Sequence, residues 1–268
     1  MLKAASLIGT HDVLLVTLDT LRYDVAEQAL ARGLTPNLAR LLPGGKWELR
    51  HSPGNFTYAA HAAIFAGFFP TPARPGKHPR LFAARFPGSE TTGGETCVFD
   101  APDIVSGLAQ RGYYTICIGG VGFFNKQSPL GNVLPGLFAE SHWSEELGVT
   151  SLHSTERQVD LACERMARLV WPKRVFLFVN ISALHQPNCI FSTPMVEDSP
   201  ATQAAALAYV DRCLPPLFAA LQRRGPTLCL FMSDHGTAYG EDGYWGHRCS
   251  HPAIWNVPYA EFILPAGG

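Results

Sequence analysis

The sequence predicts an α/β fold: a doubly wound, mostly parallel central sheet with helices on both faces. Two observations predict this fold, namely continuous short apolar runs and stretches with helical character between them. A continuous apolar run indicates a strand buried on both faces, because a half-exposed strand alternates polar and apolar residues. Strands that alternate with helices are typical of a parallel sheet. The expected strands are 13–18, 114–118, 175–179, 227–232 and 259–264.

Helices are expected between these strands, and a glycine or proline follows each of them as a stop signal. Pro215 and Pro216 fall inside the last helix. We expect them to kink or divide it, because proline removes a backbone donor and clashes with the preceding turn. The expected helices are 102–110, 155–170 and 201–224.

The composition is that of one globular domain, which we expect to span residues 1–268. Hydrophobic residues make up 47% of the chain and charged residues 16%, so the chain can form a large core and is not disordered. The formal net charge of −1 argues against a protein that mainly grips nucleic acid or an anionic membrane. We therefore expect a small-molecule partner and no nucleic acid. The sequence indicates no oligomeric state.

Two features favour a cytoplasmic protein. The seven cysteines are widely spread and form no C-x-x-C motif, which argues against a disulfide framework and suits a reducing compartment. The apolar run near the N-terminus continues directly into Asp19, which indicates a first strand and not a signal peptide or transmembrane helix. We expect no membrane insertion.

Polar residues follow two of the expected strands. Asp19 follows the first strand, and Asp234 and His235 follow the strand at 227–232. Ligands of an open parallel sheet bind beyond the carboxyl ends of its strands, so these side chains are expected at one rim. Two carboxylates and an imidazole suit a divalent ion such as Zn²⁺, Mn²⁺, Mg²⁺ or Ca²⁺. Taken singly, each is more often a helix cap or a turn residue.

A third segment supplies a candidate nucleophile. Residues 55–65 read as a loop that enters a helix of small residues, with Thr57 at or near its N-cap. The free backbone amides there form an anion site, where a metal-activated Thr57 can attack phosphorus or sulfur. The alternative is a purely structural cap. His61 lies one turn further on, either within reach of the anion or as an ordinary core histidine.

Several motifs together resemble the alkaline phosphatase superfamily, in its sulfatase and phosphonate monoester hydrolase branch. They are the strand at 13–22, the T-P-N-L helix at 35–41, the nucleophile helix at 57–67, Ser233-Asp234-His235-Gly236 and Val257-Pro258. Their order and spacing are more specific than any one motif. The resemblance covers most of residues 12–125 and 174–265 and is poor from 126 to 173. It implies an alkaline phosphatase-like core in a small sulfatase-like hydrolase.

The resemblance also implies roles for individual residues. Thr57 would be both metal ligand and nucleophile, beside the ligands Asp19, Asp234 and His235. His61 stands where sulfatases have the arginine that orients their modified cysteine. The remaining histidines implied at the substrate are His185, in a His-x-Pro position, His247 at a later basic position, and His251 beside it.

The departures from the family pattern are informative. The chain has no Cys-x-Pro-x-Arg sequence for formylglycine formation, and a threonine nucleophile is typical of branches that transfer phosphoryl or phosphonyl groups. The resemblance implies no clean second metal site. Glu241, Asp242, His247 and His251 either improvise one or simply line the pocket. The usual sulfatase C-terminal subdomain is expected to be absent.

The sequence thus predicts a metal-dependent, formylglycine-independent hydrolase or transferase of phosphate, phosphonate or sulfate esters, acting on a small anionic ester. The alternatives are a sulfuric ester hydrolase without formylglycine, a catalytically silent metal- or anion-binding module, and a nucleotide-binding fold suggested by the glycines at 119–122. The proline- and glycine-rich segment 70–95 is either a solvated loop or a basic wall beside the site.

Overall fold

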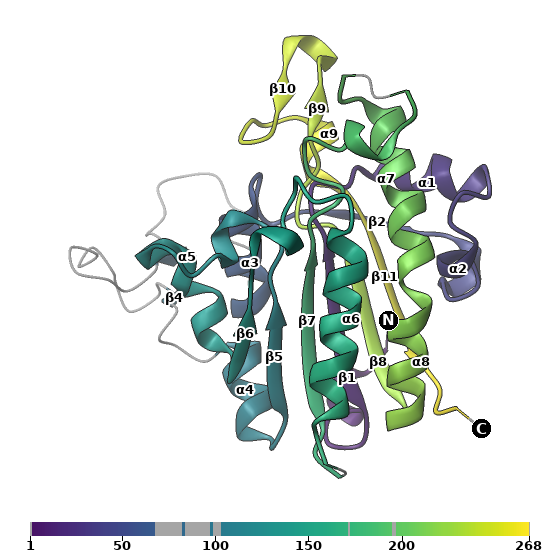
Figure 1. Cartoon of the computed structure of the whole chain (residues 1–268). Helices are drawn as coiled ribbons and strands as arrows, with labels where there is room; N and C mark the ends of the chain where they lie inside the picture. Colours follow the sequence, from purple (N-terminus) through teal and green to yellow (C-terminus); the bar gives the residue numbers. More distant parts are fainter. Residues whose placement is uncertain are drawn as a thin grey trace.

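The computed structural model describes residues 2–67, 82–83, 97–98, 103–170, 172–194 and 197–267. One seven-stranded sheet runs through them (Figure 1). Its spatial order is β2 (Glu48–His51), β11 (Asn256–Leu264), β8 (Thr227–Met232), β1 (Asp12–Leu18), β7 (Val175–Ile181), β5 (Tyr114–Ile118) and β6 (Glu140–His142). Strands β8, β1, β7, β5 and β6 are parallel, and β11 runs antiparallel to both β8 and β2. The predicted mostly parallel sheet is confirmed.

Helices cover both faces of this sheet. One face carries α1 (Tyr23–Ala31), α2 (Pro36–Ala39), α6 (Ser154–Ala167), α7 (Pro200–Cys213) and α8 (Pro215–Arg224), and the other carries α3 (Thr57–Ala66) and α4 (Ile104–Gln110). Alternate side chains of β1 enter the two layers: Leu14 and Val16 pack in the first, and Val13 and Leu15 in the second. Burial on both faces explains why this run is apolar throughout.

Most expected elements appear within a few residues of their predicted bounds. The long helix is divided as expected, because α7 ends at Cys213 and α8 begins at Pro215. Its 25 residues are long and apolar enough to cross a membrane, but 67% of their most apolar window is buried within the protein, as in a core helix. The short edge strands β2 and β6 have no counterpart among the expected strands. The basic segment 70–95 lies outside the described residues, apart from 82–83.

Several shorter helices and strands complete the described part of the fold. The C-terminal ribbon of β9 (Ala238–Tyr239) and β10 (Trp245–Gly246) stands above the sheet in Figure 1. The other short elements are α5 (Pro129–Val133), α9 (Pro252–Trp255) and the pair β3 (Phe82–Ala83) and β4 (Cys97–Val98).

Candidate active site and metal centre

The ends of two neighbouring strands bring three acidic and imidazole side chains together, as the sequence predicts. Asp19 follows β1, and Asp234 and His235 follow β8, and all three side chains are fully buried. One ligand atom from each lies within 4.8 Å of the others. Parallel neighbours in a sheet end at the same rim, which is why residues more than 200 positions apart meet here.

Each of the two carboxylates keeps one oxygen without a hydrogen-bond partner, although Asp234 Oδ2 lies 3.5 Å from His235 Nε2 and 3.6 Å from His61 Nδ1. Asp19 Oδ2 accepts a hydrogen bond from Asn180 Nδ2 at 3.0 Å, and Asp234 Oδ1 accepts one from the Thr20 amide at 3.2 Å, whereas Asp19 Oδ1 and Asp234 Oδ2 have no hydrogen-bond partner. Burial raises the pKa of Asp19 to about 6, with a further rise from the nearby Asp234 charge, and burial raises the pKa of Asp234 to about 7. Two such oxygens in one buried cluster fit a divalent cation, which would remove the cost of burying them.

His235 completes a suitable donor set. Its Nδ1 donates to the Gly236 carbonyl at 2.8 Å, so its Nε2 presents a lone pair, and burial holds its pKa below the usual value. The Thr57 hydroxyl lies 3.3 Å from this Nε2. Carboxylate, imidazole and hydroxyl donors suit Zn²⁺ or Mn²⁺, and a bound ion supplies Lewis acidity to this site.

Thr57 is the first residue of α3, one position beyond the expected cap. Phe56 occupies the N-cap and gives no side-chain cap, and the helix ends at Gly67, whose φ of 73° only glycine adopts easily. The Thr57 hydroxyl is therefore not used as a cap and faces His235 instead. The first turn of a helix leaves backbone amides without an intrahelical acceptor, so the start of α3 offers donors for an anion beside this hydroxyl.

His61 does not face the pocket, and the expectation that it contacts the anion is not supported by its position. It is fully buried, with Nδ1 2.7 Å from the Thr57 carbonyl and Nε2 2.9 Å from the Thr17 hydroxyl. Three phenylalanine rings meet it edge-on, and burial lowers its pKa to about 3. His61 is a neutral histidine that holds the Thr57 backbone through its hydrogen bond to the Thr57 carbonyl.

The backbone of the turn after β1 is strained, and a hydrogen bond from helix α7 holds it in place. Thr20 has a φ of 61°, which a β-branched residue rarely adopts, and this conformation points its amide at Asp234. Gln203 on α7 donates from Nε2 to the Thr20 carbonyl at 2.9 Å. Strain that the surroundings hold in place is typical of functional sites. Neither residue was identified from the sequence.

His185 and His247 both lie at the site, as expected. The His247 ring centroid is 4.7 Å from that of His235 and 5.6 Å from that of His185. Burial and the neighbouring cationic groups lower the pKa of His247 to about 3, so it is neutral and its buried Nδ1 has no hydrogen-bond partner. Both histidines line a pocket of about 350 Å³ together with Thr57.

His251 has a structural position. Its Nδ1 accepts the Ala253 amide at 3.1 Å and so caps α9, and its Nε2 lies 3.1 Å from Asp242. Glu241, another of the four candidates for an improvised second site, pairs with Arg22. In the part of the chain that the structure describes, Asp19, Asp234 and His235 form the one cluster of three such ligands.

Arg248 lines the same pocket and was missed by the sequence analysis. Its φ of 72° is unusual for a residue with a side chain, and its amide donates to the Asn55 carbonyl at 2.8 Å. This hydrogen bond ties Arg248 to the loop that enters α3. The motifs could not have revealed it, because it depends on a contact between residues 55 and 248.

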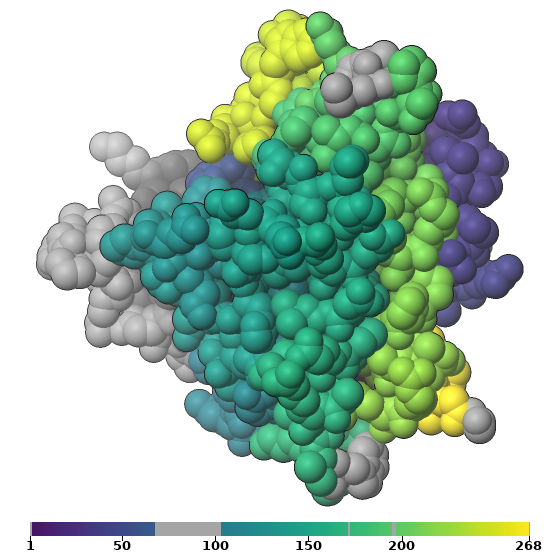
Figure 2. Space-filling model, viewed as in Figure 1, coloured from purple at the N-terminus to yellow at the C-terminus, as the bar shows by residue number. Residues whose placement is uncertain are grey.

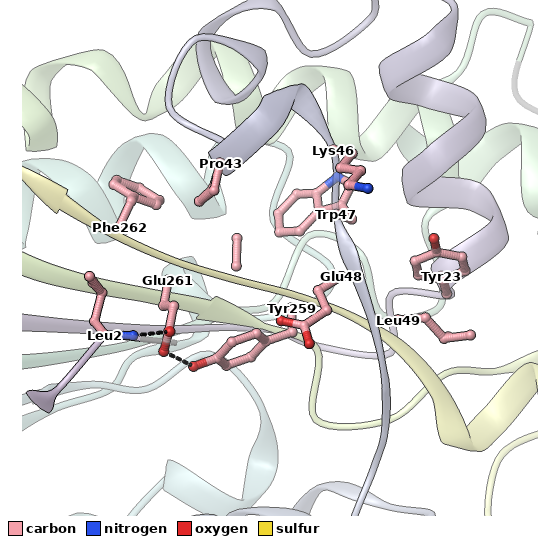
Figure 3. A pocket seen from close by; sticks show the side chains of 11 residues that line it. Leu2, Tyr23, Pro43, Lys46, Trp47, Glu48, Leu49, Tyr259, Glu261 and Phe262 are labelled. Carbon is pink, nitrogen blue, oxygen red and sulfur yellow. Dashed lines mark hydrogen bonds between the residues drawn. The ribbon is translucent and has the colours of Figure 1, made fainter.

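A larger hollow of about 690 Å³ lies at the other side of the sheet, around β2 and β11 (Figure 3). Trp47, Tyr23 and Phe262 line it, and Glu261 within it binds the Leu2 amide and the Tyr259 hydroxyl. Glu48, its other carboxylate, pairs with Arg50, so both acidic groups of this hollow already have partners. The smaller pocket at Thr57 is the one that adjoins the buried carboxylates.

Residues 11–260 match the sequence profile of the family described as Sulfatase. The chain belongs to the sulfatase family. A search of curated proteins gave no match to this sulfatase-family chain. Its fold is also that of alkaline phosphatase-superfamily structures, which confirms the resemblance noted in the sequence.

Three solved structures illustrate the fold of this sulfatase-family chain. The C-terminal periplasmic domain of phosphoethanolamine transferase EptC from Campylobacter jejuni aligns with a TM-score of 0.61 at 14% identity, over 95% of this chain and 80% of that one. The corresponding EptC domain from Escherichia coli, in complex with Zn, gives 0.61 at 13%, over 95% and 73%. The putative sulfatase yidJ from Bacteroides fragilis gives 0.62 at 15%, over 94% and 68%.

Proposed function

We propose that this chain is a metal-dependent enzyme that cleaves or transfers the anionic group of a small phosphate, phosphonate or sulfate ester, with Thr57 as the nucleophile. The observation that carries the proposal is the pair of unpartnered, fully buried oxygens of Asp19 and Asp234, which lie beside His235 and the Thr57 hydroxyl. A buried acid pair of this kind is costly unless a cation neutralises it.

The chain's own residues suggest the steps. The Thr57 hydroxyl gives up its proton and Oγ forms a bond to phosphorus or sulfur, while the bond to the ester oxygen on the opposite side breaks and that oxygen takes up one proton to leave as an alcohol, so no net proton is gained or lost. Amides of the first turn of α3 and the Arg248 side chain would bind the non-bridging oxygens. His185 and His247, which line the same pocket, would contact the departing oxygen. Water or an alcohol then releases the group from Thr57, which gives a hydrolase or a transferase. No formylglycine is required.

The test is turnover of chromogenic phosphate monoesters, diesters, phosphonates and sulfate esters with Zn²⁺, Mn²⁺, Mg²⁺ or Ca²⁺ added singly. We expect metal-dependent cleavage of at least one ester class. Thr57→Ala should abolish it, and the matched variant Thr57→Ser, which keeps a hydroxyl, should retain part of it. The proposal fails if Thr57→Ala is as active as the wild type. Metal binding without any turnover would favour a binding module.

We propose a cytoplasmic location as part of the same function. The six described cysteines with placed side chains are all free, which suits a reducing compartment. The EptC domains named above are periplasmic, so location distinguishes this chain from them if the proposal holds. Fractionation of cells that express the full-length protein tests it, and recovery outside the cytoplasm would contradict it.

A further inference from the structure

Two chemically different groups of side chains line the pocket beside Thr57. One group is cationic or imidazole and consists of His185, His247 and Arg248. The other group is apolar and comes from residues 121–149: Val121, Phe123, Leu130 and Val149. Figure 2 shows the ribbon of β9 and β10 (yellow) projecting at the top of the molecule. We name these four residues the apolar wall.

Part of the apolar wall is exposed to solvent among the described residues. Leu130 is 48% exposed, whereas Val121 is 6% exposed. The Phe123 ring is held from the side by Phe56 and Tyr58, whose ring centroids lie 6.2 Å and 5.7 Å away. A fixed aromatic face next to an exposed leucine favours a flat, apolar ligand group.

The charges of the pocket also favour an uncharged organic group on the ligand. None of its described lining residues is a carboxylate, and Arg248 stands at its rim. A cationic organic group, such as an alkylammonium, would therefore meet positive charge and find no counter-ion among these residues. The pocket volume of about 350 Å³ is near the lower end of the range for small-ligand sites, roughly 300–1,000 Å³.

We propose that the apolar wall binds the organic part of the ester and selects an uncharged aromatic group over a cationic one, while Arg248 and the histidines hold the anionic group. This inference rests on the proposed function, because it places the anionic group of the ester at Thr57. It distinguishes this chain by chemistry from enzymes that transfer a phosphoethanolamine group, which carries an ammonium.

Binding of two non-hydrolysable probes tests the inference without relying on turnover. Phenylphosphonate and 2-aminoethylphosphonate share an anionic group and differ in the organic part. Calorimetry on the full-length protein with Zn²⁺ should give a dissociation constant at least about tenfold lower for phenylphosphonate, and Leu130→Glu should reduce this preference several-fold. Leu152→Glu is the matched control, because Leu152 is equally exposed (53%) but outside the pocket, and it should leave both constants unchanged.

Equal or tighter binding of 2-aminoethylphosphonate would overturn the inference, and so would a preference that Leu130→Glu leaves intact. Failure to bind either probe would overturn it as well. The proposed function fails by a different result, namely ester turnover that does not depend on Thr57. If the protein prefers phenylphosphonate but its turnover does not depend on Thr57, the role of the apolar wall is supported and the role of Thr57 as nucleophile is rejected.

Discussion

Neutral His61 carries a hydrogen on only one of its two ring nitrogens, and the two groups that contact these nitrogens determine which one carries it. The Thr57 carbonyl can only accept, so Nδ1 donates to it, and Nε2 must accept from the Thr17 hydroxyl. The Thr17 oxygen then accepts from Asn180 Nδ2 at 3.2 Å, and the same amide nitrogen donates to Asp19 Oδ2 at 3.0 Å. Each hydrogen in this buried series of hydrogen bonds therefore has a single donor and a single acceptor. These hydrogen bonds therefore link the Thr57 backbone to the Asp19 carboxylate.

Thr17→Val tests whether this chain of hydrogen bonds positions the site. The variant keeps the side-chain shape and leaves His61 Nε2 and one Asn180 hydrogen without a partner, so we expect the free energy of unfolding to fall by about 1–3 kcal/mol. Thr17 lies outside the pocket lining, so kcat should fall about tenfold with little change in KM, a barrier increase of ~1.4 kcal/mol.

Thr17→Ser keeps the hydroxyl and should restore both quantities. Urea denaturation and steady-state kinetics with the best ester of the panel measure them. A folded Thr17→Val protein with wild-type kcat would show that the hydrogen-bond chain supports only the fold.

Strand β1 carries a fully buried aspartate at each end, and the two differ in their partners. At the start, Asp12 accepts from the Val175 amide and from Arg224 Nε, both at 3.0 Å, so both of its oxygens are satisfied. At the end, Asp19 keeps a free oxygen. Asp12 at the start of β1 is therefore structural, whereas Asp19, which follows the end of β1, is available for a ligand.

This contrast gives a matched pair of variants. Asp12→Asn removes a charge that Arg224 needs, and we expect it to lower the free energy of unfolding by about 2 kcal/mol without weakening Zn²⁺ binding. Asp19→Asn removes an unpaired buried charge, so the metal-free protein should be no less stable while Zn²⁺ binding is lost. Urea denaturation and calorimetric Zn²⁺ titration distinguish the two. Equal loss of Zn²⁺ binding in both variants would reject this assignment.

The exit of β8 depends on a close backbone approach at Gly236. A Cβ at this position would lie 1.9 Å from the Ala253 carbonyl oxygen, and the Gly236 amide donates to the Ile254 carbonyl at 2.6 Å. We expect Gly236→Ala to cost about 1–3 kcal/mol of folding free energy and to displace His235, with loss of Zn²⁺ affinity. Gly136→Ala, where a Cβ meets nothing within 4 Å, should change neither by more than ~0.5 kcal/mol. Thermal unfolding and Zn²⁺ titration of both variants decide the matter, and a tolerant Gly236→Ala would contradict the argument.

The features that could be predicted from the sequence are those that a local pattern of residues determines. The doubly buried strands are continuous apolar runs, and the residues that follow them must meet at one rim, so the cluster of Asp19, Asp234 and His235 could be predicted. The edge strands β2 and β6 could not, because they are short and lack that pattern. The orientation of His61 could not either, since α3 is made of small and apolar residues on nearly every side and its periodicity does not identify the face that meets the pocket.

The folded molecule as a whole binds protons differently from the unfolded chain, and a metal ion should reverse this difference. The pKa values of Asp19 and Asp234, about 6 and 7, lie above the 3.8 of the unfolded state. Between pH 4 and 7 the metal-free folded protein therefore holds more protons at these groups than the unfolded chain, so their contribution to stability falls as the pH rises. Buried His61 acts in the opposite sense, since its lowered pKa costs stability below about pH 6.5.

The pH dependence of Zn²⁺ affinity reports on the proposed ligands. The ion needs the His235 imidazole neutral and both carboxylates, Asp19 and Asp234, ionised. From pH 8 to pH 5 binding must displace a proton from each carboxylate, which weakens it by on the order of a thousandfold if each pH unit below a pKa costs tenfold.

The rise in Tm on adding Zn²⁺ should accordingly be larger at pH 8 than at pH 5. Thermal unfolding at a fixed Zn²⁺ concentration, with Asp12→Asn as a control that keeps the ligands, measures this difference. The control should follow the wild type, because Asp12 lies at the opposite end of β1. A Tm increase that is the same at both pH values would mean that the ion does not replace these protons, and would remove Asp19 and Asp234 from the ligand set.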